Sequence, residues 1–311
     1  MCYICHTFNF DYHLGQYSIK EVEKLTGVKA HTIRIWEQRY GIVSPHRTHT
    51  NIRYYDDAHL KKLLNVSMLI KHGRKISTIA RMSEDVLNQE VLSLVKCVTG
   101  RQDYFEMQVD VLSMSMIELD EVRFEKVFSA AESRFGFEQT MIQILIPFMR
   151  KVGMMWSTGE ISVAQEHFIS NLIRRKVIVA IDGLSVVQKS APRFLLFLPE
   201  GEWHEIGLLF AKYLIKSRGF KTLYLGQSVP LSDILNLKSS WKPDFLLSFF
   251  TTSINQQKMI SYMKAIVENF DYQKVFLCGP QAGIFASHLP EHAVDISTLF
   301  ELKEQLDAIR W

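Results

Sequence analysis

Five short apolar runs alternate with stretches of helical spacing after residue 193, and this alternation constrains the fold more than any other feature of the chain. The runs have the lengths of buried strands and are rich in branched and aromatic residues. They are RFLLFL from Arg193, TLYLG from Thr222, DFLLSFF from Asp244, KVFLCG from Lys274 and AVDIS from Ala293. Helices are expected near 206–218, 231–239, 255–269, 280–288 and 298–310. Strands joined by crossover helices predict a doubly wound, flavodoxin-like, five-stranded parallel sheet over residues 192–311.

The loop after the first of these strands carries a histidine with an acidic neighbour. It reads Glu202-x-His204-x-x-Gly207. In a sheet of this kind, ligands bind at the carboxyl ends of the strands, where the strand order reverses. A neutral imidazole is a good ligand for a transition metal, and a carboxylate on its second ring nitrogen fixes the tautomer. His204 is therefore a candidate metal ligand, with Glu202 as its orienting partner.

The middle of the chain predicts a four-helix bundle over residues 103–186, preceded by a linking helix over 84–102. The expected bundle helices are near 103–118, 120–135, 137–156 and 162–184, since the apolar residues keep helical spacing throughout. Trp156 ends the third helix, and Glu166-His167 lies on the first turns of the fourth. Taken alone, a tryptophan at a helix end indicates packing, and a Glu-His pair on an early turn indicates a solvated surface.

A compact basic module follows an N-terminal tail of residues 1–15. Residues 16–81 hold 13 lysines and arginines against 5 acidic residues, a net charge of +8, whereas the whole chain carries only +3. The rest of the chain is therefore mildly acidic. This asymmetry favours a nucleic-acid-binding domain at residues 16–83 attached to a body with a different role.

Local signals divide the basic module into a winged helix-turn-helix. Ser18 is predicted to cap a short helix that Gly27 ends. A second helix over 30–40 places its apolar residues on one face and its polar residues outward, as expected of a recognition helix. Residues 43–55 predict a small hairpin wing, and Asp56 is predicted to cap the helix that follows.

The segment YSIKEVEKLTGVKAHTIRIWEQRYGI, followed by R-x-x-x-N-x-R-Y-Y, resembles the MerR family of bacterial transcription regulators. The resemblance covers residues 17 to about 82. It implies a dimer on double-stranded DNA, with the second helix in the major groove and wing arginines at phosphates or in the minor groove. The DNA-contacting residues that it implies are Thr32, Arg34, Arg39, Arg47, Arg53 and Tyr54.

Three motifs of the C-terminal region together resemble the cobalamin-binding fold, whose pattern is Asp-x-His-x-x-Gly, then Ser-x-Leu, then Gly-Gly. Here they are the His204 loop, Ser248-Phe249-Phe250 and Cys278-Gly279, separated by 40 and 27 residues. The resemblance implies that His204 is the lower axial ligand of cobalt and that Glu202 holds its other ring nitrogen. It also implies that Gly207, Ser248 and Gly279 leave room for the nucleotide tail. Cys278 replaces the first glycine of the pattern and narrows the expected tail pocket.

A tryptophan followed after nine residues by Glu-His resembles one branch of that family, in which a MerR-type head precedes a helical bundle and a cobalamin domain. The resemblance implies that Trp156, Glu166 and His167 cap the upper face of adenosylcobalamin. It further implies a light-responsive homo-oligomer, a dimer or a tetramer, which occupies operator DNA in the dark. Ser157 stands where photoreceptor members often have a second histidine. We therefore expect a photoproduct that is water-ligated or bound by His167.

The expected function is a DNA-binding transcription regulator, a repressor that senses light through adenosylcobalamin, and not an enzyme. One alternative is a MerR-type regulator that has lost cobalamin and responds to a protein partner. Ser157 and Cys278, which depart from the pattern of the cobalamin-binding branch, are consistent with this alternative. A second is the corrinoid carrier of a methyltransferase or mutase, which has no use for residues 17–82. A metal-sensing MerR protein requires clustered thiolates, whereas Cys97 stands alone.

Composition and hydropathy set the expected location. The chain is 47% apolar and 22% charged, as in a soluble globular protein. No apolar run reaches the roughly 18 residues of a membrane span. The N-terminus lacks the basic and apolar regions of a secretory leader. A cytoplasmic protein without membrane contact is expected.

Overall fold

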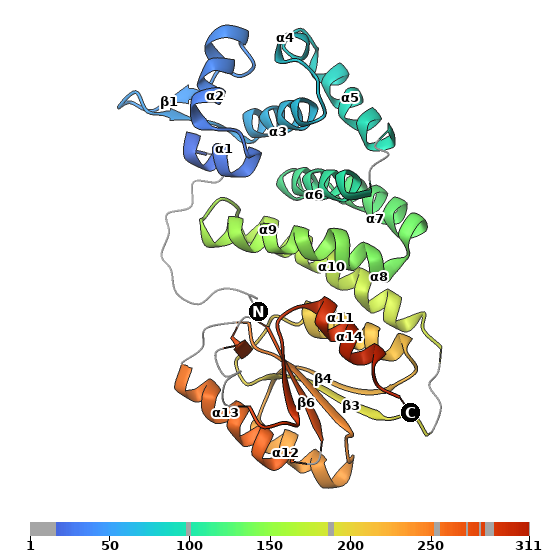
Figure 1. Cartoon of the computed structure of the whole chain (residues 1–311). Coiled ribbons are helices and arrows are strands. Elements are labelled where there is room, and N and C mark those ends of the chain that lie inside the picture. Colours follow the sequence, from blue (N-terminus) through green and yellow to red (C-terminus); the bar gives the residue numbers. More distant parts are fainter. Residues whose placement is uncertain are drawn as a thin grey trace. The chain divides into compact units, whose positions relative to one another are not determined.

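The computed structural model describes residues 17–97, 101–185, 190–251, 256–271, 273–279, 281–283 and 289–310, and their side chains except at 92–97, 101 and 256–259. The chain forms two compact units (Figure 1), and the division falls between Ile169 and Ser170, within helix α10 (Val163–Asp182). The expected N-terminal tail and most of the expected helix near 280–288 lie outside the described residues. No helix among those described is long and apolar enough to cross a membrane.

The N-terminal unit begins with the helix-turn-helix. Helix α1 (Ile19–Thr26) starts at Ser18, whose side chain and that of Glu21 form the predicted capping box, and it ends at Gly27 with φ of 71°. Helix α2 (Ala30–Ile35) continues into a π-helical turn, η1 (Trp36–Tyr40). The predicted second helix is therefore confirmed, although its last turn is wider than an α-helix.

A short hairpin and a long helix complete the head. Strands β1 (His46–Arg47) and β2 (Arg53–Tyr54) pair antiparallel, which confirms the predicted wing. Asp56 caps helix α3 (Asp57–Lys71), as expected from the sequence, and the short helix α4 (Ile76–Ile79) follows. The apolar side of α3 is fully buried, and it anchors the head on the helices after it.

The helices after the head match the expected bundle closely. They are α5 (Glu84–Cys97), α6 (Arg101–Ile117), α7 (Glu121–Phe135), α8 (Phe137–Thr140), the π-helical turn η2 (Met141–Leu145), α9 (Ile146–Ser157) and the first part of α10. The segments α8, η2 and α9 form one continuous helix, the third of the prediction. Helix α6 packs against α7, η2 and α9 around buried Phe124, Leu145 and Phe148.

The C-terminal unit is a parallel sheet with helices on both faces. Its strands are β3 (Arg193–Pro199), β4 (Lys221–Val229), β5 (Phe245–Phe249), β6 (Lys274–Cys278) and β7 (Ala293–Ile296). Their spatial order is β4-β3-β5-β6-β7, and every pair is parallel. The predicted doubly wound sheet is confirmed. The strand order reverses at β3, since β4 and β5 flank it on opposite sides, and the loop after β3 carries His204.

Each face of the sheet has its own pair of helices (Figure 1). Helix α11 (Ile206–Ser217) packs with α14 (Leu299–Asp307), and α12 (Leu231–Ser240) packs with α13 (Gln256–Asn269). Successive side chains of a strand point to opposite faces. Phe194, Phe245 and Phe276 stack on one face. The ring centroids are 4.5 Å apart between Phe194 and Phe245 and 6.2 Å apart between Phe245 and Phe276. Leu195, Leu246 and Val275 join the apolar core with α13 on the other face.

Candidate functional site

Glu202 holds His204 in one orientation at the carboxyl edge of the sheet. One carboxylate oxygen of Glu202 lies 2.6 Å from His204 Nδ1 and accepts the backbone N–H groups of Trp203 and His204, at 2.9 and 3.0 Å. The other oxygen accepts the backbone N–H of Thr251 at 2.9 Å, so the carboxylate also ties this loop to the end of β5. Glu202 is 1% exposed, whereas the His204 side chain is 28% exposed. The histidine is thus fixed through Nδ1, and Nε2 remains as the nitrogen for a ligand.

The next residue, Glu205, fixes the start of α11. Its carboxylate is almost fully buried; one oxygen lies 2.5 Å from Arg174 Nε, and the other accepts the Tyr224 hydroxyl at 2.9 Å. Arg174 belongs to the second part of α10, within the same unit as the sheet. Sequence reasoning missed this network because its three members are far apart along the chain.

Ser248 and Gly279 lie at the same edge of the sheet as the histidine. The Ser248 hydroxyl is buried, and it has no hydrogen-bond partner among the described residues. A buried hydroxyl without a partner is costly, and a ligand group can satisfy it. Gly279 has φ of 99°, and a Cβ atom there would lie 2.6 Å from the backbone oxygen of Phe250. The fold itself therefore requires glycine at this position.

Phe249 narrows the space beside Gly207, and Cys278 is buried next to Phe249 on the neighbouring strand. A Cβ atom on Gly207 would lie 3.1 Å from the nearest atom of the Phe249 ring, so the ring packs directly on this glycine. Cys278 pairs in register with Phe249 on the neighbouring strand and is 1% exposed. Burial raises the pKa of the Cys278 thiol well above its usual value, so the thiol is neutral. The sequence had indicated narrowing by Cys278 but gave no signal for Phe249.

The corner predicted to cap a ligand lies in the N-terminal unit. Trp156 and Ser157 are the last residues of α9, and the Ser157 hydroxyl donates to the Met154 carbonyl at 2.8 Å. Glu166 is buried, and its carboxylate lies 2.5 Å from His167 Nδ1. The His167 side chain is 29% exposed. A carboxylate thus orients a partly exposed imidazole here too. Taken alone, the sequence had indicated a solvated Glu-His pair, whereas Glu166 is buried.

The loop between these residues connects to the helix-turn-helix. Glu160 in this loop has a side chain that is only 3% exposed, and it forms an ion pair of 3.4 Å with Lys24 of α1. The Thr158 hydroxyl donates to Glu160 at 2.7 Å. Ser162 and Gln165 cap the start of α10 through reciprocal hydrogen bonds, and Gln165 also donates to the Ile117 carbonyl at 3.1 Å. The loop after Trp156 is therefore linked to the bundle by a hydrogen bond and to the head by an ion pair.

The predicted DNA-contacting residues differ in how free they are. Arg34, Arg39 and Arg47 are exposed, and Arg47 donates to the Asn51 side chain at 2.8 Å within the wing. Thr32 is half-buried on the outward side of α2. These positions make a basic, accessible surface along the second helix and the wing, as a groove-binding module requires.

The other two predicted contacts also have internal partners. Arg53 is 29% exposed and forms an ion pair of 3.2 Å with Glu37 of η1. Tyr54 stacks on His46, with ring centroids 5.2 Å apart. Asp56 binds His46 at 2.9 Å while capping α3, which fixes the wing to that helix. Arg53 and Tyr54 therefore position the wing, and their contact with DNA stays a prediction.

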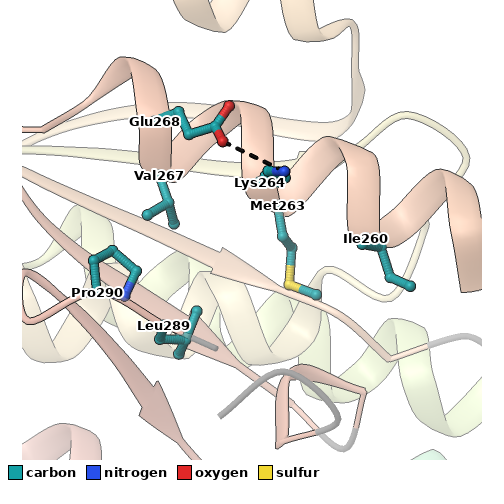
Figure 2. A pocket seen from close by; sticks show the side chains of 7 residues that line it. All are labelled: Ile260, Met263, Lys264, Val267, Glu268, Leu289 and Pro290. Atoms are coloured by element: carbon teal, nitrogen blue, oxygen red, sulfur yellow. Dashed lines mark ion pairs between the residues drawn. The ribbon is translucent and has the colours of Figure 1, made fainter. Parts of the chain in front are cut away.

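The C-terminal unit also contains a cavity of about 620 Å³ between α13 and the segment before β7. Figure 2 shows the side chains that line it, with Met263 and Val267 on the helix and Leu289 and Pro290 opposite. His292, two residues after Pro290, contacts the Val267 carbonyl at 3.1 Å. The cavity therefore lies at the amino ends of the strands, the edge opposite to His204.

Comparisons with known proteins match both the helix-turn-helix domain and the helical bundle. Residues 17–85 match the MerR HTH family regulatory protein model, and residues 109–180 match the B12 binding domain model. The HTH-type transcriptional repressor CarH of Myxococcus xanthus is 29% identical over 74% of this chain and 77% of its own length. The repressor CarA of the same organism is 26% identical over 79% of this chain and 80% of its own length. 

A solved structure supports the fold of most of the chain. The monomethylamine corrinoid protein of Methanosarcina barkeri aligns with a TM-score of 0.50 and 17% identity, over 71% of this chain and 100% of that protein. Together, the winged head, the sheet and these matches support a DNA-binding transcription regulator with a B12-binding domain. The chain carries a MerR-type helix-turn-helix domain and a B12-binding domain, and it is homologous to the repressors CarH and CarA.

Proposed function

We propose that this protein is a repressor whose occupancy of operator DNA is set by adenosylcobalamin and by light. The observation that carries the proposal is the Glu202–His204 pair, because it presents an oriented imidazole at the ligand-binding edge of the sheet. Homology to two transcriptional repressors supports the same function.

The residues of the sheet unit suit the cofactor in part. In the proposal, His204 Nε2 would bind cobalt, because Glu202 holds the tautomer that leaves this nitrogen free to coordinate. The buried, unpartnered Ser248 hydroxyl offers a hydrogen bond to the nucleotide tail, and Gly207 and Gly279 add no side-chain bulk beside it. The Phe249 ring packs against Gly207, so it would have to turn away to admit a tail beside that glycine.

The residues of the N-terminal unit are proposed to serve the upper face and the DNA. Trp156, Glu166 and His167 contribute to the upper face, where the cofactor, when bound, supplies a cobalt–carbon bond that visible light breaks. Arg34, Arg39 and Arg47 contact DNA phosphates in a dimer or a larger assembly. Each phosphate contact steepens the logarithmic salt dependence of DNA binding by about 0.9.

The test uses the full chain, loaded with adenosylcobalamin in the dark and freed of excess cofactor. We expect retained colour, an increased mass in solution by light scattering, and binding to operator DNA. Green light is expected to lower both the mass and the DNA affinity, since ligand loss shifts the population between assembly states. Colour that washes out would contradict cofactor binding. Retained colour with no effect of light would leave a cobalamin-binding regulator but refute the light sensor.

A testable route for the signal is the ion pair between Lys24 and Glu160. Changing Lys24→Met or Glu160→Gln removes the link between α1 and the loop that follows Trp156. We expect either variant to reduce the ratio of DNA affinities in the dark and in the light about fivefold or more. The double variant is expected to lose no more than either single one, because both remove the same interaction. Titration of labelled DNA in each state measures the ratio.

Lys29→Met is the matched control for this experiment. Lys29 also lies in the head and pairs with an acidic side chain, Glu23, but its own side chain is 73% exposed. Such a pair contributes little, and the ratio of affinities should stay unchanged. Equal effects of Lys24→Met and Lys29→Met would show that general charge, and not this link, determines the response.

A second candidate function is a MerR-type regulator that no longer binds cobalamin and responds to a protein partner. The specific observation in its favour is that the Phe249 ring fills the space beside Gly207. The same loading experiment separates the two functions, since this regulator binds DNA but retains no colour.

A further inference from the structure

Phe249 packs against Gly207, one of the glycines beside which the proposed function places the tail of the cofactor. The atoms of its ring would lie 3.1, 3.3 and 3.5 Å from a Cβ atom on Gly207, so the ring edge covers this glycine. Gly207 lies in the first turn of α11, just after the histidine loop. The ring is therefore next to the proposed cobalt ligand, on the side of the sheet where α11 packs.

The ring is not fixed by the apolar core in the way that its neighbours are. Phe249 is only half-buried, whereas Phe250 is 1% exposed and belongs to the core cluster on the other face of the sheet. Phe249 is also the last residue of β5. A half-buried ring at a strand end has room for a rotamer change, which a fully packed ring lacks.

The shape of the ring matters because the nucleotide tail of cobalamin ends in a planar aromatic base. We propose that Phe249 is a selectivity residue of the corrin site: its ring takes the place of that base, so a corrinoid without a nucleotide tail binds undisturbed, whereas cobalamin has to displace the ring. The proposal rests on the function proposed above and adds to it which class of corrinoid the site favours.

The size of the effect follows from the population of the competent state. If the ring leaves the slot open in a tenth of the molecules or fewer, the apparent affinity for cobalamin falls about tenfold or more. The affinity for a tailless corrinoid does not fall. Cobalt coordination by His204 is common to both ligands and cancels in the comparison.

The experiment compares adenosylcobalamin with adenosylcobinamide, which lacks the nucleotide, on the full chain in the dark. Affinities are measured by visible absorption for the wild type, Phe249→Ala and Phe249→Tyr. We expect Phe249→Ala to bind adenosylcobalamin about tenfold tighter, with the affinity for adenosylcobinamide unchanged. Phe249→Tyr keeps the ring and should resemble the wild type. Phe300→Ala removes an aromatic ring that is 58% exposed on α14 and serves as the control.

The ratio of the two corrinoid affinities, and not the melting temperature of the ligand-free protein, distinguishes this role from a structural one. Phe249→Ala removes packing from Gly207, so it lowers the melting temperature under either explanation. A purely structural ring would then weaken both corrinoids together, and that result overturns the proposal. An unchanged ratio of the two affinities also overturns it while leaving the proposed function intact. Failure of every variant to bind either corrinoid refutes the proposed function itself.

Discussion

Replacing His204 with alanine is expected to weaken adenosylcobalamin binding by more than about 100-fold. The reason is that His204 is the one ring in the described sheet unit that a buried carboxylate holds at the carboxyl edge, at 2.6 Å from Nδ1. Loss of a partner that only orients a metal ligand already costs about 10- to 100-fold in affinity, and loss of the ligand costs more. Visible absorption should also change to that of a corrinoid without a lower imidazole.

Glu202→Gln separates coordination from orientation. The amide keeps an oxygen toward the loop but removes the charge that fixes the tautomer, so we expect about a 10-fold loss of affinity with the spectrum of the wild type. His49→Ala, at the exposed tip of the wing, is the control for loss of a histidine. A His204→Ala variant with the affinity and spectrum of the wild type would show that cobalt is not bound from this side.

Most of the fold could be predicted because its signals are local. The Ser18–Glu21 capping box and the Asp56 cap each involve residues three apart, so the sequence places both helix starts to the residue. The strands are continuous apolar runs, because a parallel sheet with helices on both faces buries both of its sides. These apolar runs also predict the order of strands and helices. From that order, the His204 loop is expected where the strand order of the sheet reverses.

Features that depend on contacts between distant residues could not be predicted. Lys24 and Glu160 are residue types that usually lie on the surface. Nothing in the neighbouring sequence indicates that the Glu160 side chain is only 3% exposed and forms an ion pair with Lys24. Phe249 is similar: it reads as one more apolar residue of a buried strand. Its role follows only from which face of β5 it occupies and from the absence of a side chain on Gly207.

Gly279→Ala is expected to destabilise the sheet unit by about 2–6 kcal/mol. Gly279 has φ of 99°, a conformation that costs other residues about 1–3 kcal/mol. The new Cβ atom would also lie 2.6 Å from the Phe250 oxygen and 3.1 Å from its carbonyl carbon, and such overpacking costs about 1–3 kcal/mol. Relaxation is restricted, since Phe250 donates to the Cys278 carbonyl at 2.8 Å and accepts from Gln281 at 3.2 Å. Hydrogen exchange of the β5 and β6 amides in urea measures the loss.

Gly226→Ala is the matched control in the same unit. Gly226 has φ of 80°, but a Cβ atom there meets only the Tyr224 ring, at 3.4 Å. Its cost should be limited to the backbone conformation, so Gly279→Ala should be the more damaging by about 1–3 kcal/mol. Equal losses would show that β5 and the Gly279 turn are not in close contact. A larger loss for Gly279→Ala means that the fold alone requires this glycine, so cofactor binding has to be judged from His204, Ser248 and Phe249.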